Sequence, residues 1–98
     1  MASSSSSPDP WKPVKIVGLA CSLEIFETLY DGPKRFADLK IACPNESTRT
    51  ERLRLMEEAG YIKTEAAKIG RRNFIHYKLT DKGKRAVEHL LAIRKLFE

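Results

Sequence analysis

The apolar residues of this chain follow a helical period over most of its length, but they change to a two-residue period within residues 61–80. In residues 73–80, Ile75, Tyr77 and Leu79 alternate with polar side chains, as in a strand with one buried face. Residues 61–67 are also rich in aromatic and β-branched side chains, and the linker at 68–72 joins the two segments as a hairpin. One hairpin within an otherwise helical chain predicts an α+β fold.

Four segments place apolar residues three and four positions apart, the spacing that gives a helix one buried face. They cover residues 14–30, 37–42, 48–59 and 81–97. Glycine or proline follows each of the first three, and both residue types end helices. Residues 45–47, and Thr80 or Asp81, offer side-chain oxygens as N-caps for the last two helices.

Residues 1–13 differ in composition from the rest of the chain. They hold five consecutive serines and three prolines, with Trp11 as the one aromatic side chain. Such a segment buries too little apolar surface to offset the entropy lost on ordering. We therefore predict a flexible N-terminal arm over residues 1–13 and a single domain over residues 14–98, whose last helix serves dimerisation.

The charge balance favours an anionic partner. Eighteen Lys and Arg residues against 13 Asp and Glu residues give a net charge of +5, and basic proteins attract nucleic acid or acidic lipid surfaces. The longest apolar run, residues 16–21, is much shorter than the roughly 18 residues that a membrane-spanning helix needs. No segment combines a basic helical face with a strongly apolar one, so the sequence favours double-stranded DNA over a membrane.

The residue types that carry catalysis or bind metals are scattered along the chain. Cys21 and Cys43 lack the spacing of metal ligands and are too few for a disulfide scaffold, which favours a reducing compartment. His76 and His89 fall on different predicted elements, and the sequence has no glycine-rich phosphate loop. We therefore predict a cytoplasmic, nucleoid-associated protein that is not an enzyme and uses no metal or cofactor.

The predicted elements follow the order of a winged helix-turn-helix. A helix, a short strand-like link, a short helix, a turn and a third helix precede the hairpin and the last helix. In this fold, three helices form the core, the two-stranded hairpin forms a wing, and the third helix enters the DNA major groove. The chain adds a C-terminal helix to that pattern.

Three segments of the sequence carry a family resemblance: residues 23–39, 52–62 and 77–83. Together they resemble prokaryotic winged-helix regulators of the HxlR, MarR and ArsR kind, over about residues 16–96. The resemblance implies that Glu58-Ala59-Gly60-Tyr61-Ile62 closes the recognition helix and opens the first wing strand, and that residues 77–83 join the second wing strand to the last helix. The chain departs from the HxlR pattern at Arg49, where that pattern has an apolar residue.

The third helix supplies candidate base contacts. With 100° per residue, Leu53, Met56 and Ala59 point inward, and the opposite face is polar. Arginine pairs with guanine O6 and N7, and threonine contacts base edges or the thymine methyl group. The predicted recognition residues are Ser47, Thr48, Arg49, Thr50 and Arg54. A capped surface helix, with ion pairs such as Arg54 to Glu58, remains the alternative interpretation.

The hairpin concentrates positive charge. Residues 66–80 contain Lys68, Arg71, Arg72 and Lys78 but no Asp or Glu, and Gly70 suits the turn. A basic tip of this kind fits beside phosphates or into a narrow minor groove. We predict DNA contacts by Lys68, Arg71 and Arg72, with a solvated basic loop as the alternative.

The last helix carries more apolar surface than a domain of this size covers. Such a surface indicates a partner, and a twofold homodimer would present two recognition helices about one DNA turn apart, roughly 34 Å. The predicted dimerisation residues are Leu19, Val87, Leu90, Leu91 and Phe97. In the alternative interpretation the helix only closes its own core.

These features lead to one hypothesis and one competitor. The hypothesis is a homodimeric, sequence-specific double-stranded DNA-binding transcriptional regulator, with its recognition helix in the major groove and its wing on the adjacent backbone or minor groove. The competitor is a winged-helix module that binds another protein within a transcription-related assembly. Acidic residues along the third helix, Glu46, Glu51, Glu57 and Glu58, favour the competitor.

Overall fold

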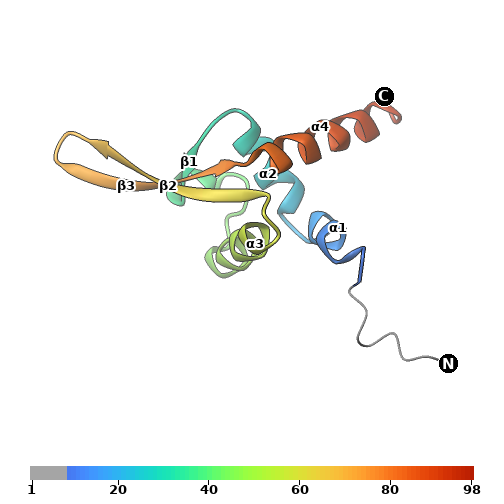
Figure 1. Ribbon diagram of the computed structural model, residues 1–98, viewed down its shortest axis with the longest axis horizontal. Coiled ribbons are helices and arrows are strands. Elements are labelled where there is room, and N and C mark those ends of the chain that lie inside the picture. The colour runs from blue at the N-terminus through green and yellow to red at the C-terminus, as the bar shows by residue number, and fades with distance from the viewer. Residues whose placement is uncertain (1–8) are drawn as a thin grey trace.

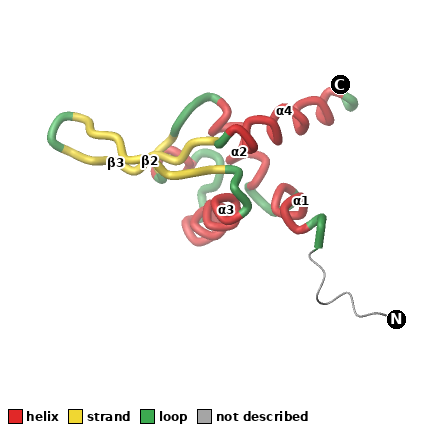
Figure 2. Tube along the Cα trace, viewed as in Figure 1, coloured by secondary structure: helices red, strands yellow, loops and turns green. Residues whose placement is uncertain are grey.

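The computed structural model describes residues 9–98 and has the predicted α+β fold (Figure 1). Two helices lead into a short strand and a 3-10 helix, and a third helix, a hairpin and a last helix follow (Figure 2). The elements are α1 (Lys12–Val17), α2 (Ser22–Tyr30), β1 (Lys34–Arg35), η2 (Ala37–Lys40), α3 (Glu46–Glu58), β2 (Ile62–Ile69), β3 (Arg72–Leu79) and α4 (Asp81–Lys95). The hairpin projects away from the helices, whereas α1 and the end of α4 lie on the opposite side of the molecule (Figure 1).

The prediction of one helix over residues 14–30 was wrong, because the chain breaks between α1 and α2. Cys21, the N-cap of α2, has a φ of 72°, a left-handed conformation that interrupts the helical hydrogen bonds. Helix α1 begins at Lys12, ahead of the predicted domain start at residue 14, and the Tyr61 hydroxyl donates to the carbonyl of Pro13 at 2.9 Å. Residues 1–8 of the predicted arm lie outside the described residues.

The three strands form an antiparallel sheet in the order β1-β3-β2. The hairpin strands reach closer to the turn than predicted, since Lys68 pairs with Asn73 and Ile69 pairs with Arg72. Only Gly70 and Arg71 remain as the turn, and Gly70 takes the positive φ of 64° that a tight hairpin turn requires. The predicted five-residue linker is therefore mostly strand.

The core lies where α2, α3, the base of the sheet and α4 meet. Phe26 of α2 packs edge-on against Tyr61, with ring centroids 5.3 Å apart, and Leu53 and Met56 of α3 are fully enclosed as predicted. Val87 of α4 is only 2% exposed and belongs to the same cluster. Burial of these apolar side chains holds α3 and the wing base in fixed positions relative to each other.

Among the predicted N-cap candidates, Asn45 caps α3 and Thr80 caps α4. The Asn45 side chain accepts a hydrogen bond from the backbone N–H of Thr48 at 2.9 Å, and the Thr80 hydroxyl accepts one from the N–H of Gly83 at 3.1 Å. Gly83 also lies against the wing base, because a Cβ atom there would stand 2.0 Å from the carbonyl oxygen of Tyr61. The sequence thus fixes the start of α3 and the junction between wing and α4.

Candidate nucleic-acid interface

The N-terminal half of α3 presents small polar side chains to solvent. Ser47 and Thr50 are exposed and Thr48 is half-buried, while Asn45 caps the helix behind them. Helix α3 packs against β2, the first strand of the wing (Figure 1). Hydroxyl groups in this position are free to contact base edges or phosphates.

Arg54, in the second half of α3, is held by two glutamates. Its Nε donates to Glu51 at 3.2 Å, and its two terminal nitrogens donate to Glu51 and Glu58. The hydrogen bonds between Glu51 and Arg54 lower the pKa of Glu51 and raise the pKa of Arg54, so both members of this pair are charged at neutral pH. The ion pair that the alternative interpretation expected at Arg54 and Glu58 is present.

The structure corrects the placement of Arg49 among the recognition residues. Its side chain is only 4% exposed, its Nη1 donates to the carbonyl of Cys43 at 2.8 Å, and its guanidinium lies 4.3 Å from the ring centre of Phe36. Arg49 therefore takes the inward position that the HxlR pattern gives to an apolar residue. Stacking on an aromatic face makes this burial of an arginine tolerable.

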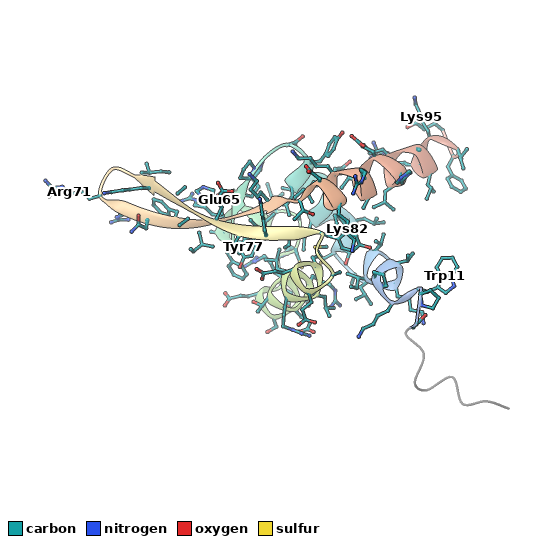
Figure 3. The ribbon with its side chains drawn as sticks, viewed as in Figure 1. Trp11, Glu65, Arg71, Tyr77, Lys82 and Lys95 are labelled. Carbon is teal, nitrogen blue, oxygen red and sulfur yellow. The ribbon has the colours of Figure 1, made fainter. Side chains whose placement is uncertain are left out.

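The wing tip keeps its positive charge unpaired. Lys68, Arg71 and Arg72 are all exposed, and no ion pair within residues 9–98 includes any of them. Figure 3 shows Arg71 at the far end of the hairpin, beyond the other elements. The three predicted wing residues thus form one exposed basic group, which we call the wing tip.

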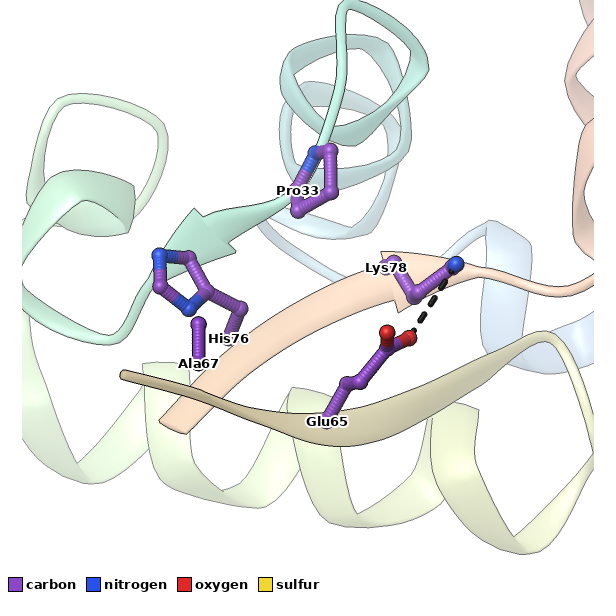
Figure 4. Close-up of a pocket in the computed structure, with 5 residues that line it drawn as sticks. All are labelled: Pro33, Glu65, Ala67, His76 and Lys78. Atoms are coloured by element: carbon purple, nitrogen blue, oxygen red, sulfur yellow. Dashed lines mark ion pairs between the residues drawn. The ribbon is translucent and has the colours of Figure 1, made fainter. Parts of the chain in front are cut away.

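The base of the wing has a different character from its tip. Lys78 pairs with Glu65 across the hairpin at 3.1 Å. Residues 66–80 contain no acidic residue, but this glutamate from the opposite strand neutralises one of their four basic residues. These two side chains, with Pro33, Ala67 and His76, line a small pocket of about 190 Å³ (Figure 4). Glu65 and His76 are direct partners in the strand register, so the pocket lies on one face of the sheet.

The α3-facing side of the sheet is defined by Tyr77. This residue alternates with His76 and Lys78 and so lies on the opposite face of β3. Burial, and to a lesser extent the carboxylate of Glu57 in α3, raises the pKa of Tyr77. Tyr77 therefore lies on the face of the sheet that is turned toward α3, opposite the pocket.

The predicted dimerisation residues divide into two groups. Val87 is a correction, because its burial in the core leaves it no surface for a partner. Leu90 and Leu91 are half-buried, Leu19 is 38% exposed and Phe97 is 84% exposed. Part of α4 thus closes the core, as the alternative interpretation held, and its C-terminal half keeps an exposed apolar surface.

A groove of about 350 Å³ runs between α2 and α4 beside this apolar surface. Leu23 of α2 and Ile93 of α4 are about half exposed along it. An ion pair between Arg94 and Glu27, at 2.7 Å, connects the two helices there. Apolar surface of this extent marks an interaction site on many proteins.

The two cysteines lie at the starts of two helices, Cys21 as the N-cap of α2 and Cys43 just before α3. Cys43 is fully buried two positions before the N-cap of α3, and its thiol donates to the carbonyl of Asn45 at 3.8 Å. Burial, and after it the neighbouring Cys21 thiol, raises the pKa of Cys43 to about 11. Its thiol therefore stays protonated at neutral pH. Within residues 9–98, no helix is both long and apolar enough to cross a membrane.

The arrangement of three core helices, an antiparallel wing and a further helix defines a winged helix-turn-helix domain. The model of the HxlR-like helix-turn-helix family matches residues 16–98, and the chain belongs to this family. Membership in it indicates a transcriptional regulator. A comparison with curated proteins gave no match.

Solved structures share this fold. A regulator of the MarR family from Enterococcus faecalis V583 is 22% identical, with a TM-score of 0.76 over 96% of this chain and 90% of its own. The reduced form of the transcriptional regulator YodB from B. subtilis is 23% identical, with a TM-score of 0.74 over 84% of this chain and 81% of its own. The transcriptional repressor BigR from Xylella fastidiosa is 24% identical, with a TM-score of 0.69 over 88% and 83%.

Proposed function

We propose that this protein is a cytoplasmic, sequence-specific double-stranded DNA-binding regulator that acts as a homodimer. Helix α3 enters the major groove, and the wing tip contacts the adjacent backbone or minor groove. The observation that carries the proposal is the charge of Lys68, Arg71 and Arg72, which no ion pair within residues 9–98 neutralises, on a wing whose first strand packs against α3. Phosphates are the partner that three exposed cations on a projecting hairpin fit best.

The residues divide between two kinds of contact. Arg54 and the hydroxyl groups of Ser47, Thr48 and Thr50 supply base readout, because they lie on the solvent side of α3. The wing tip supplies phosphate contacts, which fix register and contribute most of the affinity that depends on salt. Binding needs no cofactor in this scheme.

A second copy of the chain covers the exposed apolar part of α4. The wing and this part of α4 point in opposite directions, so a dimer built through α4 leaves both DNA-binding sides free (Figure 1). Leu19, Leu90, Leu91 and Phe97 are the contact residues that we propose for this interface. A twofold axis there presents two copies of α3 to successive major grooves, roughly 34 Å apart.

The proposal is tested by binding-site selection on random duplexes, followed by affinity measurements against salt concentration. If about six phosphates are neutralised per dimer, the logarithm of affinity falls against the logarithm of salt with a slope on the order of −5. The selected sites are expected to be near-palindromic. A slope close to zero, or a selection that enriches no sequence, would overturn the proposal.

A second candidate function is a winged-helix module that binds another protein. The four glutamates of α3 favour it, since Glu46, Glu57 and the two partners of Arg54, Glu51 and Glu58, place negative charge where DNA would approach. Two results together would favour this function. Affinity purification would recover a stoichiometric protein partner, and the protein would bind all DNA duplexes with the same affinity.

A further inference from the structure

Glu51, Arg54 and Glu58 form a single charged unit on the exposed face of α3. Their positions, three and four residues apart, place them in one row along the helix. Glu51 accepts from Nε and Nη2 of Arg54, and Glu58 accepts from Nη1. We call this row the arginine clamp.

The clamp leaves Arg54 with a defined remaining capacity to donate. A guanidinium carries five N–H groups, and the two carboxylates engage one on each of its three nitrogens. One hydrogen therefore remains on Nη1 and one on Nη2. A bidentate contact to O6 and N7 of guanine uses two such hydrogens, so the clamped arginine still matches guanine.

The clamp also carries repulsion. Two carboxylates and one guanidinium give the row a net charge of −1, and the three side chains are between 46% and 61% exposed. Carboxylates facing DNA are repelled by phosphates and by the acceptor atoms of bases, and they are satisfied only by a donor such as the N4 amino group of cytosine. Guanine supplies two adjacent acceptors for Arg54, and the free N4 hydrogen of its paired cytosine supplies a donor for one of the two carboxylates, so a G·C pair fits the clamp better than the other base pairs do.

We propose that Glu51 and Glu58 are positioning residues that fix Arg54 for guanine and penalise other base pairs, so that the clamp reads one G·C pair in each half-site. The inference rests on the proposed function and deepens it. Specificity then has two sources: repulsion by the carboxylates at incorrect base pairs, and hydrogen bonds from Arg54 at the correct one. A merely stabilising ion pair on the helix surface would change the affinity for all sequences alike.

The test compares selected sites and affinities for the wild type, Glu51→Gln, Glu58→Gln, Arg54→Ala and the control Glu57→Gln. Glu57 lies on the same helix, is exposed and, within residues 9–98, forms no ion pair, so its variant removes the same charge without touching the clamp. Glutamine keeps the shape of glutamate and removes its charge.

We expect the wild type to select a G·C pair, and exchange of that pair for A·T to lower its affinity about tenfold. In Glu51→Gln and Glu58→Gln, we expect the affinity for the A·T-exchanged duplex to rise. The ratio of the affinity for the selected duplex to that for the exchanged duplex then falls severalfold. In Glu57→Gln the ratio stays at the wild-type value. Arg54→Ala loses the G·C preference.

Two results overturn the inference in distinguishable ways. If the wild type selects a site but Glu51→Gln and Glu58→Gln behave as Glu57→Gln does, the clamp is an ordinary surface ion pair and the proposed function stands. The same holds if Arg54→Ala retains the selected sequence. If the wild type selects no sequence, the proposed function fails and the inference fails with it.

Discussion

Helix α3 and the wing both carry several cations, but they use them differently. All three arginines of α3 are engaged within the protein: Arg49 donates to Cys43, Arg52 donates to the carbonyl of Ala20 at 2.9 Å, and Arg54 is clamped by glutamates. At the wing tip, by contrast, Lys68, Arg71 and Arg72 form no ion pair within residues 9–98. Equal numbers of basic residues therefore give a nearly neutral helix and a strongly cationic tip.

The difference indicates a division of labour between affinity and selectivity. Free cations at the tip attract any duplex, and this attraction weakens with salt. Engaged arginines on α3 have fixed orientations and add little to long-range attraction. We expect the wing to set how strongly DNA is bound and the helix to set which DNA is bound.

The largest expected effect comes from removing the free charge. In the Arg71→Ala/Arg72→Ala double variant, four cations are lost per dimer, and we expect the slope of log affinity against log salt to become shallower by roughly four. Arg54→Ala serves as the comparison, and its slope should stay close to that of the wild type. Equal slopes for the two variants, measured by fluorescence anisotropy, would break the distinction between tip and helix.

The next effect concerns the base of the wing, which is tightly packed, whereas the tip is exposed to solvent. In Gly83→Ala the added methyl group meets the Tyr61 carbonyl, so we expect a loss of about 3 kcal/mol in the free energy of unfolding, at the upper end of overpacking costs. Lys84→Ala, at the exposed neighbouring position, is the matched control. Chemical denaturation of both variants measures the difference in their free energies of unfolding. A Gly83→Ala protein as stable as the wild type would show that the backbone at Tyr61 shifts to make room for the methyl group.

A third prediction separates two arginines of the same helix. Arg49→Ala leaves the buried carbonyl of Cys43 without its donor and opens space over Phe36, and we expect a loss of about 2 kcal/mol in stability. Arg54→Ala should unfold at nearly the wild-type denaturant concentration, because its partners are exposed. The reverse order of stability would contradict the assignment of Arg49 to the core.

A final prediction concerns a pH dependence at Cys43, which is buried just before α3. The thiol of Cys43 has its pKa raised to about 11 in the folded protein, so the unfolded chain, with an ordinary thiol pKa, loses its proton first as pH rises. The stability is complete below pH 9 and is lost between pH 9 and about 11. We expect the wild type to lose roughly 2 kcal/mol more over this range than Cys43→Ala. Parallel losses in the two proteins, followed by circular dichroism, would contradict this.

Element types and order could be predicted from the sequence because periodicity and caps reflect local physics. The break at Cys21 could not, since a left-handed non-glycine residue depends on how α1 and α2 pack rather than on its own preference. The strand pairing next to the hairpin turn was also not predicted. Two flanking cations, Lys68 and Arg72, look like a loop in sequence, yet they continue the strand pairing.

The candidate site was predicted less well than the fold, for one physical reason. Whether a charged side chain is free or paired depends on its partners, and these partners come from other elements of the fold. Lys78 is neutralised by Glu65 on the opposite strand, and Arg49 is stacked on Phe36, which precedes η2. The departure of Arg49 from an apolar pattern was the one sequence signal that indicated its burial.

The short reach of β1 has a mechanical consequence for the wing. Strand β1 pairs with β3 only at Tyr77 and His76, so the outer part of the hairpin, residues 66–75, is a two-stranded ribbon. This ribbon extends about 13 Å beyond its last lateral support, and a tilt of roughly 10° at that point displaces the tip by roughly 2 Å. Bending of this ribbon lets the arginines at its end adjust to a duplex whose groove width and curvature vary from site to site.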